Sequence, residues 1–269
     1  LFKRLRMGHD ARVTLKREIG AYKGYGIFSP KNAYANVNVR ETDRLLEVVS
    51  DFHPEAVINA VGVVKQRSSS NEFLSSLEIN GLLPHRLSTL CGAINARLLH
   101  MSTDCVFSGR KGGYTESDPS DAEDLYGKTK YLGEVTGSHC ITFRTSIIGR
   151  ELSRKKSLLE WFLAQKGHVE GFKNAIFSGF TTIELSNIVE KILVDFPNAS
   201  GIYHVSSDPI TKFDLLTLIK KTLGLSVEID ANEEFRCDRS LDSTRFRREF
   251  NYTPPTWESM INELAKEDI

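Results

Sequence analysis

The sequence predicts an α/β fold: a parallel β-sheet with helices on both faces, followed by a small C-terminal α+β lobe. Three observations support this prediction. Short apolar, β-branched runs alternate with helical patterns over the first 150 residues, as in sheets joined by crossover helices. The pattern becomes less regular after that point. The length of 269 residues allows a large domain with a small lobe. We therefore expect one domain at 1–150 and a second at 151–269, with some later segments returning to the sheet.

The elements of the first domain follow from periodicity. Residues 41–52 place apolar side chains three and four apart, the spacing of one helix face. The next helical pattern, 71–93, is interrupted by Pro84. Strands are predicted at 11–17, 55–64, 96–104 and 139–149, and helices at 41–52, 71–93 and from about 125. Sheets of this kind bind ligands beyond the carboxyl ends of their strands.

The elements of the second part are mixed in order. Thr211 is expected to cap a helix that Gly224 ends, because threonine favours N-caps and glycine favours the position after a helix. The other expected elements are helices at 157–165, 183–196 and 256–267, an extended segment at 174–181 and a strand at 200–207.

Composition argues against several classes of partner. Lys+Arg and Asp+Glu are both 35, so the net charge is zero and no global field favours nucleic acid or an anionic membrane. No apolar run reaches the length of a membrane span, and the first residues lack the apolar core of a signal peptide. The four cysteines form no C-x-x-C pair, which favours a reduced, cytoplasmic setting. The histidines show no metal-site spacing; His204 is expected to be a strand residue.

The front of the sequence lacks one expected feature. In a dinucleotide-binding unit, a strand and a Gly-rich turn come before the first helix, but the G-x-G-x-x-G pattern is absent from the printed sequence. That strand normally lies in the middle of the sheet, where its absence would leave two open edges. We therefore expect a segment of about 15–20 residues to precede the printed chain.

The segment "DLYGKTK" contains a pair suited to acid–base chemistry. Tyr126 and Lys130 lie four residues apart, on one face of a predicted helix. A phenol has an ordinary pKa of about 10, and a nearby cation lowers it toward neutrality. The pair therefore predicts a proton donor tuned by an ammonium group. On its own it is weak evidence, because a Tyr-x-x-x-Lys spacing often occurs by chance.

Two strand ends add candidate residues. Ser102, Thr103 and Asp104 follow the strand 96–101, where hydroxyl groups are able to bond a substrate oxygen; they also suit an ordinary turn. Asn59-Ala60-Val61-Gly62 ends the strand before it. Its small side chains let a ring or ribose approach the backbone.

Taken together, these segments resemble the extended short-chain dehydrogenase/reductase superfamily, and most closely the dTDP-4-dehydrorhamnose reductase family. The matching segments are "NAVG", "STDCVFSG", "YTESD", "LYGKTKYLGE", "FRTSIIG", and the C-terminal "GIYHVSS", "TKFDL" and "LDSTRFRREFNYTPPTWESM". The resemblance covers nearly the whole chain. It implies a Rossmann-like fold and an NAD(P)-dependent nucleotide-sugar oxidoreductase that reduces the 4-keto group of a nucleotide-linked 6-deoxyhexose for cell-surface polysaccharide biosynthesis.

The resemblance also implies roles for single residues. Tyr126 would donate the proton to the C4 oxygen, and Lys130 would hold the nicotinamide ribose and lower the tyrosine pKa. Thr103 would bond the reacting oxygen and Asp104 the sugar. Cys105 and Phe107 are expected beside the substrate. The implied cofactor contacts are Asn59, Ala60, Val61, Gly62, Asn80, Ser102, Tyr126, Lys130 and Ser146.

The preference between NADPH and NADH rests on two basic residues. Lys16 and Arg17 come directly after the second strand of the expected fold. An acidic residue there suits a ribose 2′-OH, whereas basic residues suit a 2′-phosphate. We expect NADPH, with NADH also possible; a solvated pair of charges is an equally good explanation of the two residues. No metal is expected.

Several alternatives stay open at this level. Gly179-Phe180-Thr181 departs from the Gly-x-Pro-Thr type of segment of the family, so a UDP-linked N-acetylated 6-deoxyhexose competes with a dTDP-linked sugar. An epimerase or dehydratase of the same superfamily is a second possibility, although no glutamate follows Thr103-Asp104. A non-catalytic regulatory or binding subunit with this fold is a third. A homodimer is also possible.

Overall fold

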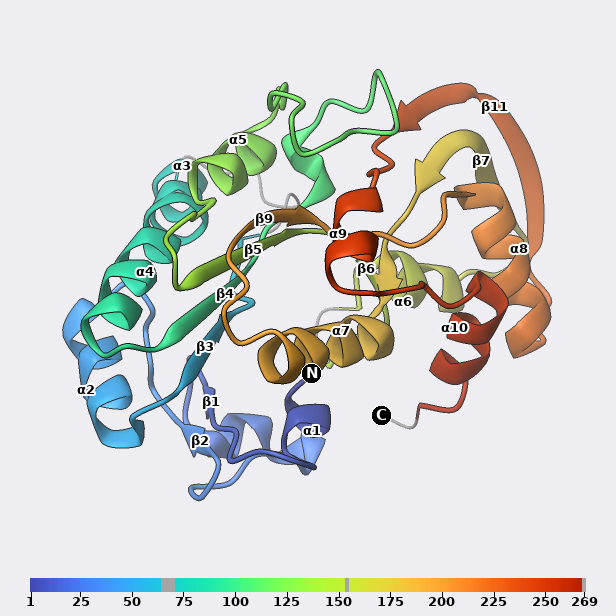
Figure 1. Ribbon diagram of the computed structural model, residues 1–269. Helices are drawn as coiled ribbons and strands as arrows, with labels where there is room; N and C mark the ends of the chain where they lie inside the picture. Colours follow the sequence, from blue (N-terminus) through green and yellow to red (C-terminus); the bar gives the residue numbers. More distant parts are fainter. Residues whose placement is uncertain (64–70, 153–154, 268–269) are drawn as a thin grey trace. The chain divides into compact units, whose positions relative to one another are not determined.

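The structure is a computed structural model that describes residues 1–63, 71–152 and 155–267 (Figure 1). Two compact units divide the chain. Unit 1 comprises Leu1–Ser102, Glu123–Phe143 and Val189–Ile202, and unit 2 comprises Thr103–Ala122, Arg144–Ile188 and Tyr203–Ile269. Both units therefore take residues from each side of position 150.

A parallel arrangement of β3, β4 and β5 forms the centre of unit 1. β3 (Ala56–Asn59) pairs with β4 (Arg97–Met101), which pairs in parallel with β5 (Cys140–Arg144); β9 (Gly201–His204) follows in the strand order. β5 is buried at every position, which explains its continuous apolar and β-branched sequence. β3 ends at Asn59, earlier than expected, because the next three residues are exposed.

Helices cover the sheet on one side. α2 (Thr42–Phe52), α4 (Leu83–Ala93) and α5 (Leu125–Leu132) lie along β3, β4 and β5 (Figure 1). The hydrophobic core between them contains Leu45, Val48, Leu83, Leu87, Cys91, Leu98, Val135 and Cys140. Cys91 and Cys140 are small residues of this core, since neither is exposed.

The expected helix 71–93 consists of three segments. α3 (Asn71–Ser76) leads into a π-helical turn, η2 (Leu77–Leu82), and α4 follows. Pro84 lies in the first turn of α4, directly after η2, and it has no N–H to donate to the preceding turn. The interruption predicted at the proline is therefore a change of helix type.

The first residues of unit 1 form small elements. α1 (Phe2–Leu5) is followed by β1 (Val13–Thr14), the 3₁₀ turn η1 (Ile19–Tyr25) and β2 (Ala33–Tyr34). β1 and β2 pair in parallel as a two-stranded sheet of their own. The strand predicted at 11–17 is thus confirmed at its centre.

Unit 2 contains two further sheets. β7 (His168–Phe177) lies between β10 (Ile210–Thr211), which is antiparallel to it, and β11 (Glu228–Asp238), which is parallel. β6 (Ile147–Ile148) pairs with β8 (Phe180–Thr181). The strand predicted at 139–149 is therefore wrong as a single element, because its last residues join a different sheet from β5.

The helices predicted for unit 2 are present, and the structure adds short helical segments at 104–106 and 244–249. The helical segments of unit 2 are η3 (Asp104–Val106), α6 (Leu158–Leu163), α8 (Lys212–Leu223), α9 (Thr244–Glu249) and α10 (Trp257–Leu264), while α7 (Thr182–Asp195) continues into unit 1. The caps of α8 are confirmed. Thr211 Oγ1 accepts a hydrogen bond from the Asp214 amide, and Gly224 adopts the left-handed conformation.

Candidate active site

The helix α5 presents the tyrosine–lysine pair. Its first turn is fixed by Asp124, whose carboxylate accepts a 2.8 Å hydrogen bond from the Gly127 amide. This cap satisfies one of the free N–H groups of the helix start. Tyr126 is half-buried and Lys130 is buried. The predicted helix and the one-turn spacing of the pair are confirmed.

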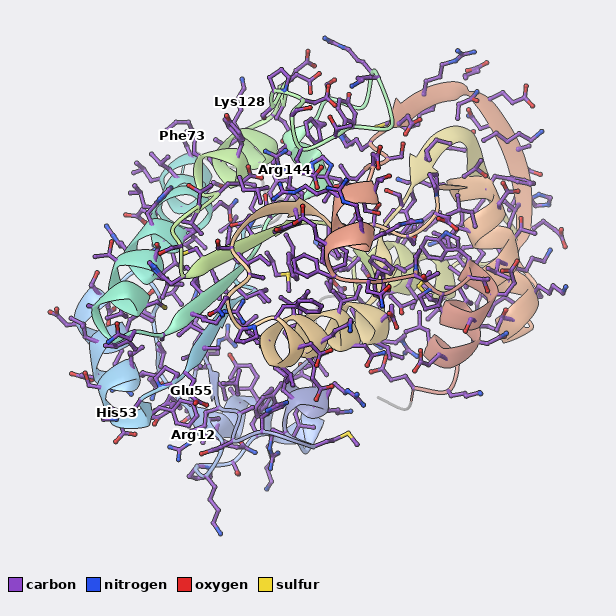
Figure 2. All side chains as sticks on the ribbon, viewed as in Figure 1. Arg12, His53, Glu55, Phe73, Lys128 and Arg144 are labelled. Atoms are coloured by element: carbon purple, nitrogen blue, oxygen red, sulfur yellow. The ribbon has the colours of Figure 1, made fainter. Side chains whose placement is uncertain are left out.

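Lys130 is held inside unit 1 by a backbone group. Its ammonium donates a 2.5 Å hydrogen bond to the Met101 carbonyl at the end of β4. Burial lowers the pKa of Lys130 to about 8, and the nearby Glu134 carboxylate partly opposes this change. Lys128, two residues earlier on α5, is exposed and points away from the unit (Figure 2). Position on the helix therefore gives two lysines entirely different surroundings.

The turn after β3 is anchored at one end and exposed beyond it. Asn59 is buried, and its Oδ1 accepts a 3.2 Å hydrogen bond from the Val61 amide. Ala60, Val61 and Gly62 are exposed. The segment is thus anchored at Asn59 and open beyond it, as the prediction of close backbone approach requires.

Asn80 connects this turn to α5. Its Oδ1 accepts from the Val63 amide at 2.8 Å, while Nδ2 donates to the Val63 carbonyl at 3.0 Å and to Thr129 Oγ1 at 3.2 Å. Both polar atoms of this fully buried amide are therefore engaged with protein groups. The structure indicates that Asn80 fixes the geometry of the turn and of α5.

Gly133 allows the end of α5 to approach η2 closely. A Cβ atom at this position would overlap the carbonyl oxygen of Asn80 and crowd Pro84. The close approach brings Asn80 within reach of Thr129, which precedes Lys130. Sequence reasoning did not select Gly133 or Thr129, although both lie within the quoted "LYGKTKYLGE" segment.

Ser102 comes directly after β4 and is the last residue of the first segment of unit 1. Its hydroxyl donates a 2.7 Å hydrogen bond to Glu134 Oε1. Glu134 is also the carboxylate that favours the charged form of Lys130. The expected cofactor residue Ser102 therefore belongs to the polar surroundings of the lysine.

In unit 2, Thr103 and Asp104 form a tight turn. Thr103 Oγ1 accepts from the Cys105 amide and donates to Asp104 Oδ1, both at 3.2 Å. Burial raises the pKa of Asp104, while hydrogen bonds from Cys105, Thr103 and Ser146 and the charge of Arg239 oppose the rise. The structure thus brings together Thr103, Asp104, Cys105 and Ser146 within unit 2.

Phe107 lies inside unit 2 in a buried cluster. Its ring stacks on Tyr114 at 4.1 Å, packs edge-on against His204 at 5.6 Å, and lies 5.2 Å from the Arg144 guanidinium. Arg144 donates to His204 Nε2 at 3.2 Å, and the other ring nitrogen of His204 lies 2.9 Å from the Tyr114 carbonyl. The expectation that His204 is a strand residue is confirmed. The cluster fixes the segment that follows Asp104.

The two basic residues of the cofactor prediction lie after β1. Lys16 and Arg17 are both exposed, in a bend of the chain. Exposure leaves their charges available to an anionic group. It is equally compatible with two solvated cations.

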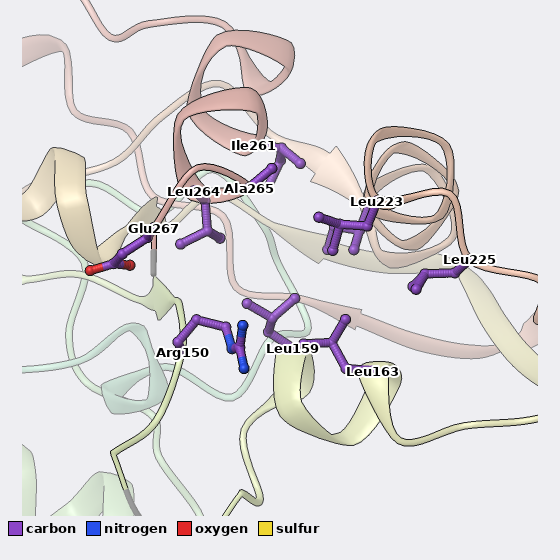
Figure 3. Close-up of a pocket in the computed structure, with 10 residues that line it drawn as sticks. Arg150, Leu159, Leu163, Leu223, Leu225, Ile261, Leu264, Ala265 and Glu267 are labelled. Atoms are coloured by element: carbon purple, nitrogen blue, oxygen red, sulfur yellow. The ribbon is translucent and has the colours of Figure 1, made fainter. Parts of the chain in front are cut away.

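An apolar cavity of about 260 Å³ lies elsewhere in unit 2 (Figure 3). It is formed mainly by α6, α8 and α10 and lined by Arg150, Leu159, Leu163, Ile219, Leu223, Leu225, Ile261, Leu264, Ala265 and Glu267. None of the predicted site residues is among these side chains. We therefore do not assign the cavity to cofactor or sugar.

The described part of the chain contains neither a cluster of metal ligands nor a membrane-spanning helix. Among residues 1–63, 71–152 and 155–267, no group of three or more His, Cys, Asp or Glu is arranged to hold a metal ion. In the same part of the chain, no helix is both long and apolar enough to cross a membrane.

Comparison with known sequences gives the family. The pattern of the family described as "RmlD substrate binding domain" matches residues 14–269. The chain belongs to this family. The expected family and the expected α/β fold are therefore confirmed, and the match extends over both units.

Individual relatives within and around the family are distant. The chain is 27% identical over 245 residues to the spore coat polysaccharide biosynthesis protein SpsK of Bacillus subtilis, covering 86% of each chain. It is 24% identical over 258 residues to a dTDP-4-dehydrorhamnose reductase of Aggregatibacter actinomycetemcomitans, covering 86% of this chain and 87% of the relative.

A solved structure supports the fold. The dTDP-4-dehydrorhamnose reductase of Bacillus anthracis, determined in complex with NADP, superposes with a TM-score of 0.76 at 18% identity, covering 94% of this chain and 98% of that chain. At this identity the likeness concerns the fold.

Proposed function

We propose that this chain is an NADPH-dependent oxidoreductase that reduces the 4-keto group of a nucleotide-linked 4-keto-6-deoxyhexose, as a step in making a cell-surface polysaccharide sugar. The function and the enzyme class expected from the sequence agree with the family and with the names of its relatives, and the expected cofactor agrees with the NADP bound to the Bacillus anthracis structure. NADH remains a possible second cofactor. A reduced cytoplasmic setting fits the four free cysteines.

The observation that carries the proposal is the buried lysine on α5. Lys130 is a buried cation fixed to the Met101 carbonyl, one helical turn from Tyr126. With its pKa at about 8, it stays mostly charged at neutral pH. A cation in this position stabilises phenolate, so it lets Tyr126 give up its proton more readily.

The residues of unit 1 fit a dinucleotide. Ala60, Val61 and Gly62 expose their backbone, and Lys16 and Arg17 expose two positive charges. Small side chains allow close approach, and the cations suit the 2′-phosphate of NADPH. When bound, NADPH supplies the hydride that reduces the C4 carbonyl.

The proton for this reaction comes from the protein. Tyr126 donates it to the C4 oxygen as that oxygen gains charge, so the products are an alcohol and a phenolate. The phenolate, stabilised by Lys130, then regains a proton from solvent. Thr103 and Asp104 are proposed to bind the sugar, with Cys105 beside it. Phe107, expected there from the sequence, is fully buried and supports this segment from inside unit 2. The raised pKa of Asp104 reflects the burial of its carboxyl group.

The decisive experiment measures NADPH oxidation with dTDP- and UDP-linked 4-keto-6-deoxyhexoses. We expect turnover with one of the two nucleotides and its loss in Tyr126→Phe, with NADPH binding retained. A protein that binds NADPH and reduces neither class would contradict the proposed function and favour a binding subunit. Turnover that survives Tyr126→Phe would contradict the role of the tyrosine.

We further propose a homodimer formed through α3, η2 and α5. These segments contact one another in unit 1 and expose several large apolar side chains, among them Phe73, which projects outward in Figure 2. The exposed residues are Phe73, Leu74, Leu82, Tyr131 and Leu132. A contiguous apolar surface favours association with a second copy. Light scattering on Phe73→Glu tests this, since an unchanged dimer would exclude the surface.

A further inference from the structure

His100 is a buried histidine without a role in the proposed reaction. It lies on β4 directly beside Asn59 of β3, and neither residue has appreciable solvent exposure. Asn59 Nδ2 and His100 Nδ1 are 3.1 Å apart. His100 therefore contacts the residue that anchors the Ala60–Gly62 turn.

The hydrogen bonds determine which nitrogen of the His100 imidazole carries the proton. Asn59 Oδ1 accepts from the Val61 amide, so its Nδ2 is the atom that faces His100. An amide N–H is only a donor, and Nδ1 must accept from it. Neutral His100 therefore carries its proton on Nε2.

The surroundings keep the ring neutral. Burial lowers the pKa of His100 well below its ordinary value, and Lys130 and His85 act in the same direction, while a backbone hydrogen bond with Asn59 partly opposes the change. Lys130 donates to the carbonyl of Met101, the next residue along β4. A protonated ring would have donors on both nitrogens and would lose the bond from Asn59.

The Nε2 atom of His100 has no hydrogen-bond partner among the described residues. An unpartnered buried donor is unfavourable, and native proteins rarely keep one without compensation. The bond accepted at Nδ1 does not remove this cost, but it fixes the orientation of the Asn59 amide. That orientation in turn presents Oδ1 to Val61.

We propose that His100 is a positioning residue: through Asn59 it holds the Asn59–Gly62 turn in the geometry that binds the dinucleotide. The inference rests on the proposed function for the identity of that ligand. In this role His100 acts through Asn59, the first residue of the turn.

Three variants of the full-length protein separate this role from simple packing. His100→Leu keeps the volume but removes the acceptor. His100→Asn restores an acceptor near the position of Nδ1. Leu99→Ala, on the opposite face of the same strand and equally buried, is the control for a general loss of stability.

Fluorescence titration with NADPH is the main measurement. We expect His100→Leu to weaken binding and to raise the KM for NADPH by about tenfold, because misplacing a contact segment costs affinity. We expect His100→Asn to bind within about threefold of the wild type, and Leu99→Ala to lower the thermal midpoint without changing NADPH affinity. Wild-type affinity in His100→Leu would overturn the proposal.

The imidazole ¹⁵N spectrum of the ligand-free wild type gives a second readout that needs no catalysis. Protonation at Nε2 is expected, and protonation at Nδ1 would overturn the proposal. The proposed function and the role of His100 are contradicted by different results. A wild type that binds NADPH but reduces no sugar contradicts only the proposed function, whereas a wild type that does not bind NADPH contradicts both.

Discussion

Asn80 Nδ2 lies 3.2 Å from Thr129 Oγ1, while the same amide group spans the N–H and the carbonyl of Val63. One buried side chain thus joins the end of the turn after β3 to the helix of Tyr126 and Lys130. The turn predicted to bind the cofactor and the helix predicted to supply the proton are therefore held together by the same buried amide.

Replacing Asn80 tests this link. We expect Asn80→Ala to destabilise the protein by about 2–4 kcal/mol, because it leaves buried backbone groups of Val63 without partners. Urea unfolding measures the change, and Thr129→Ser, which keeps the hydroxyl, serves as the control. A loss below about 0.5 kcal/mol, typical of surface sites, would contradict the link.

Lys130 and Lys128 provide a matched pair on one helix. We expect Lys130→Met to lower kcat by about 10²–10⁴-fold, the usual range for a lost acid–base contribution, because the cation that stabilises phenolate is gone. Lys128→Met, at the exposed position, is expected to keep wild-type kcat. Equal losses in both variants would indicate a general effect of charge.

The same lysine predicts a pH dependence. With a pKa of about 8, Lys130 is charged below that pH and neutral above it. We expect the kcat/KM of the wild type to fall as pH rises through about 8. In Lys130→Arg the guanidinium keeps its charge, so the part of this decrease that comes from loss of the cation is expected to disappear, while the part that comes from ionisation of the Tyr126 phenol remains. A wild-type profile that is flat to pH 10 would exclude the tuning role.

Lys16 tests the choice of cofactor. We expect Lys16→Asp to raise the KM for NADPH by about tenfold while changing that for NADH little, because only NADPH carries the 2′-phosphate. Lys23→Asp makes the same charge change at another exposed position of unit 1. If the two variants behave alike, Lys16 is only a solvated cation.

Gly133 tests the close approach of α5 and η2. We expect Gly133→Ala to destabilise the protein by about 1–3 kcal/mol, because the added carbon overlaps the Asn80 carbonyl. Gly24→Ala is the control, since a Cβ there meets no atom within 4 Å. Thermal unfolding of the two variants measures the difference; equal midpoints would contradict the packing.

His204 predicts acid sensitivity. Burial and the charge of Arg144 lower the pKa of His204 to about 4, with a smaller opposing effect of the hydrogen bond to Tyr114 and of Asp118 and Asp242. Below pH 6.5, His204 binds a proton in the unfolded chain but not yet in the folded protein. Stability is therefore full above that pH and falls as pH decreases toward 4, by up to about 1.4 kcal/mol per pH unit.

Unfolding between pH 7 and 5 measures this slope. We expect His204→Asn to show a smaller slope than the wild type, since asparagine does not titrate. His53→Asn replaces an exposed histidine (Figure 2) and is expected to keep the wild-type slope. Identical slopes in all three proteins would assign the acid sensitivity to other groups.

Local signals predicted part of the fold well. Thr211 and Gly224 mark the ends of α8 because capping is a property of neighbouring residues. β11 was missed, because "EIDANEEFRCD" is charged and exposed along most of its length. Its strand conformation comes from pairing with β7, far away in the sequence, and such tertiary effects override propensity.

In the candidate site too, local features were predicted from the sequence and tertiary contacts were not. Tyr126 and Lys130 were predicted from their spacing, and the helix that displays them is present. Asn80 was predicted as a cofactor contact, but its bonds to Val63 and Thr129 depend on the π-helical turn, which no periodicity revealed. The placement of His100 beside Asn59 depends on strand register, which the sequence alone does not specify.

The π-helical turn Leu77–Leu82 also limits how this segment is able to change in length. A π turn holds one residue more than an α turn, and each residue advances a helix by about 100°. Deleting one residue here would restore an ordinary α-helix and rotate either Asn80 or the apolar face of α4 away from its partners. Of the helices in unit 1, this one is therefore expected to tolerate insertions and deletions least, even where single substitutions are accepted.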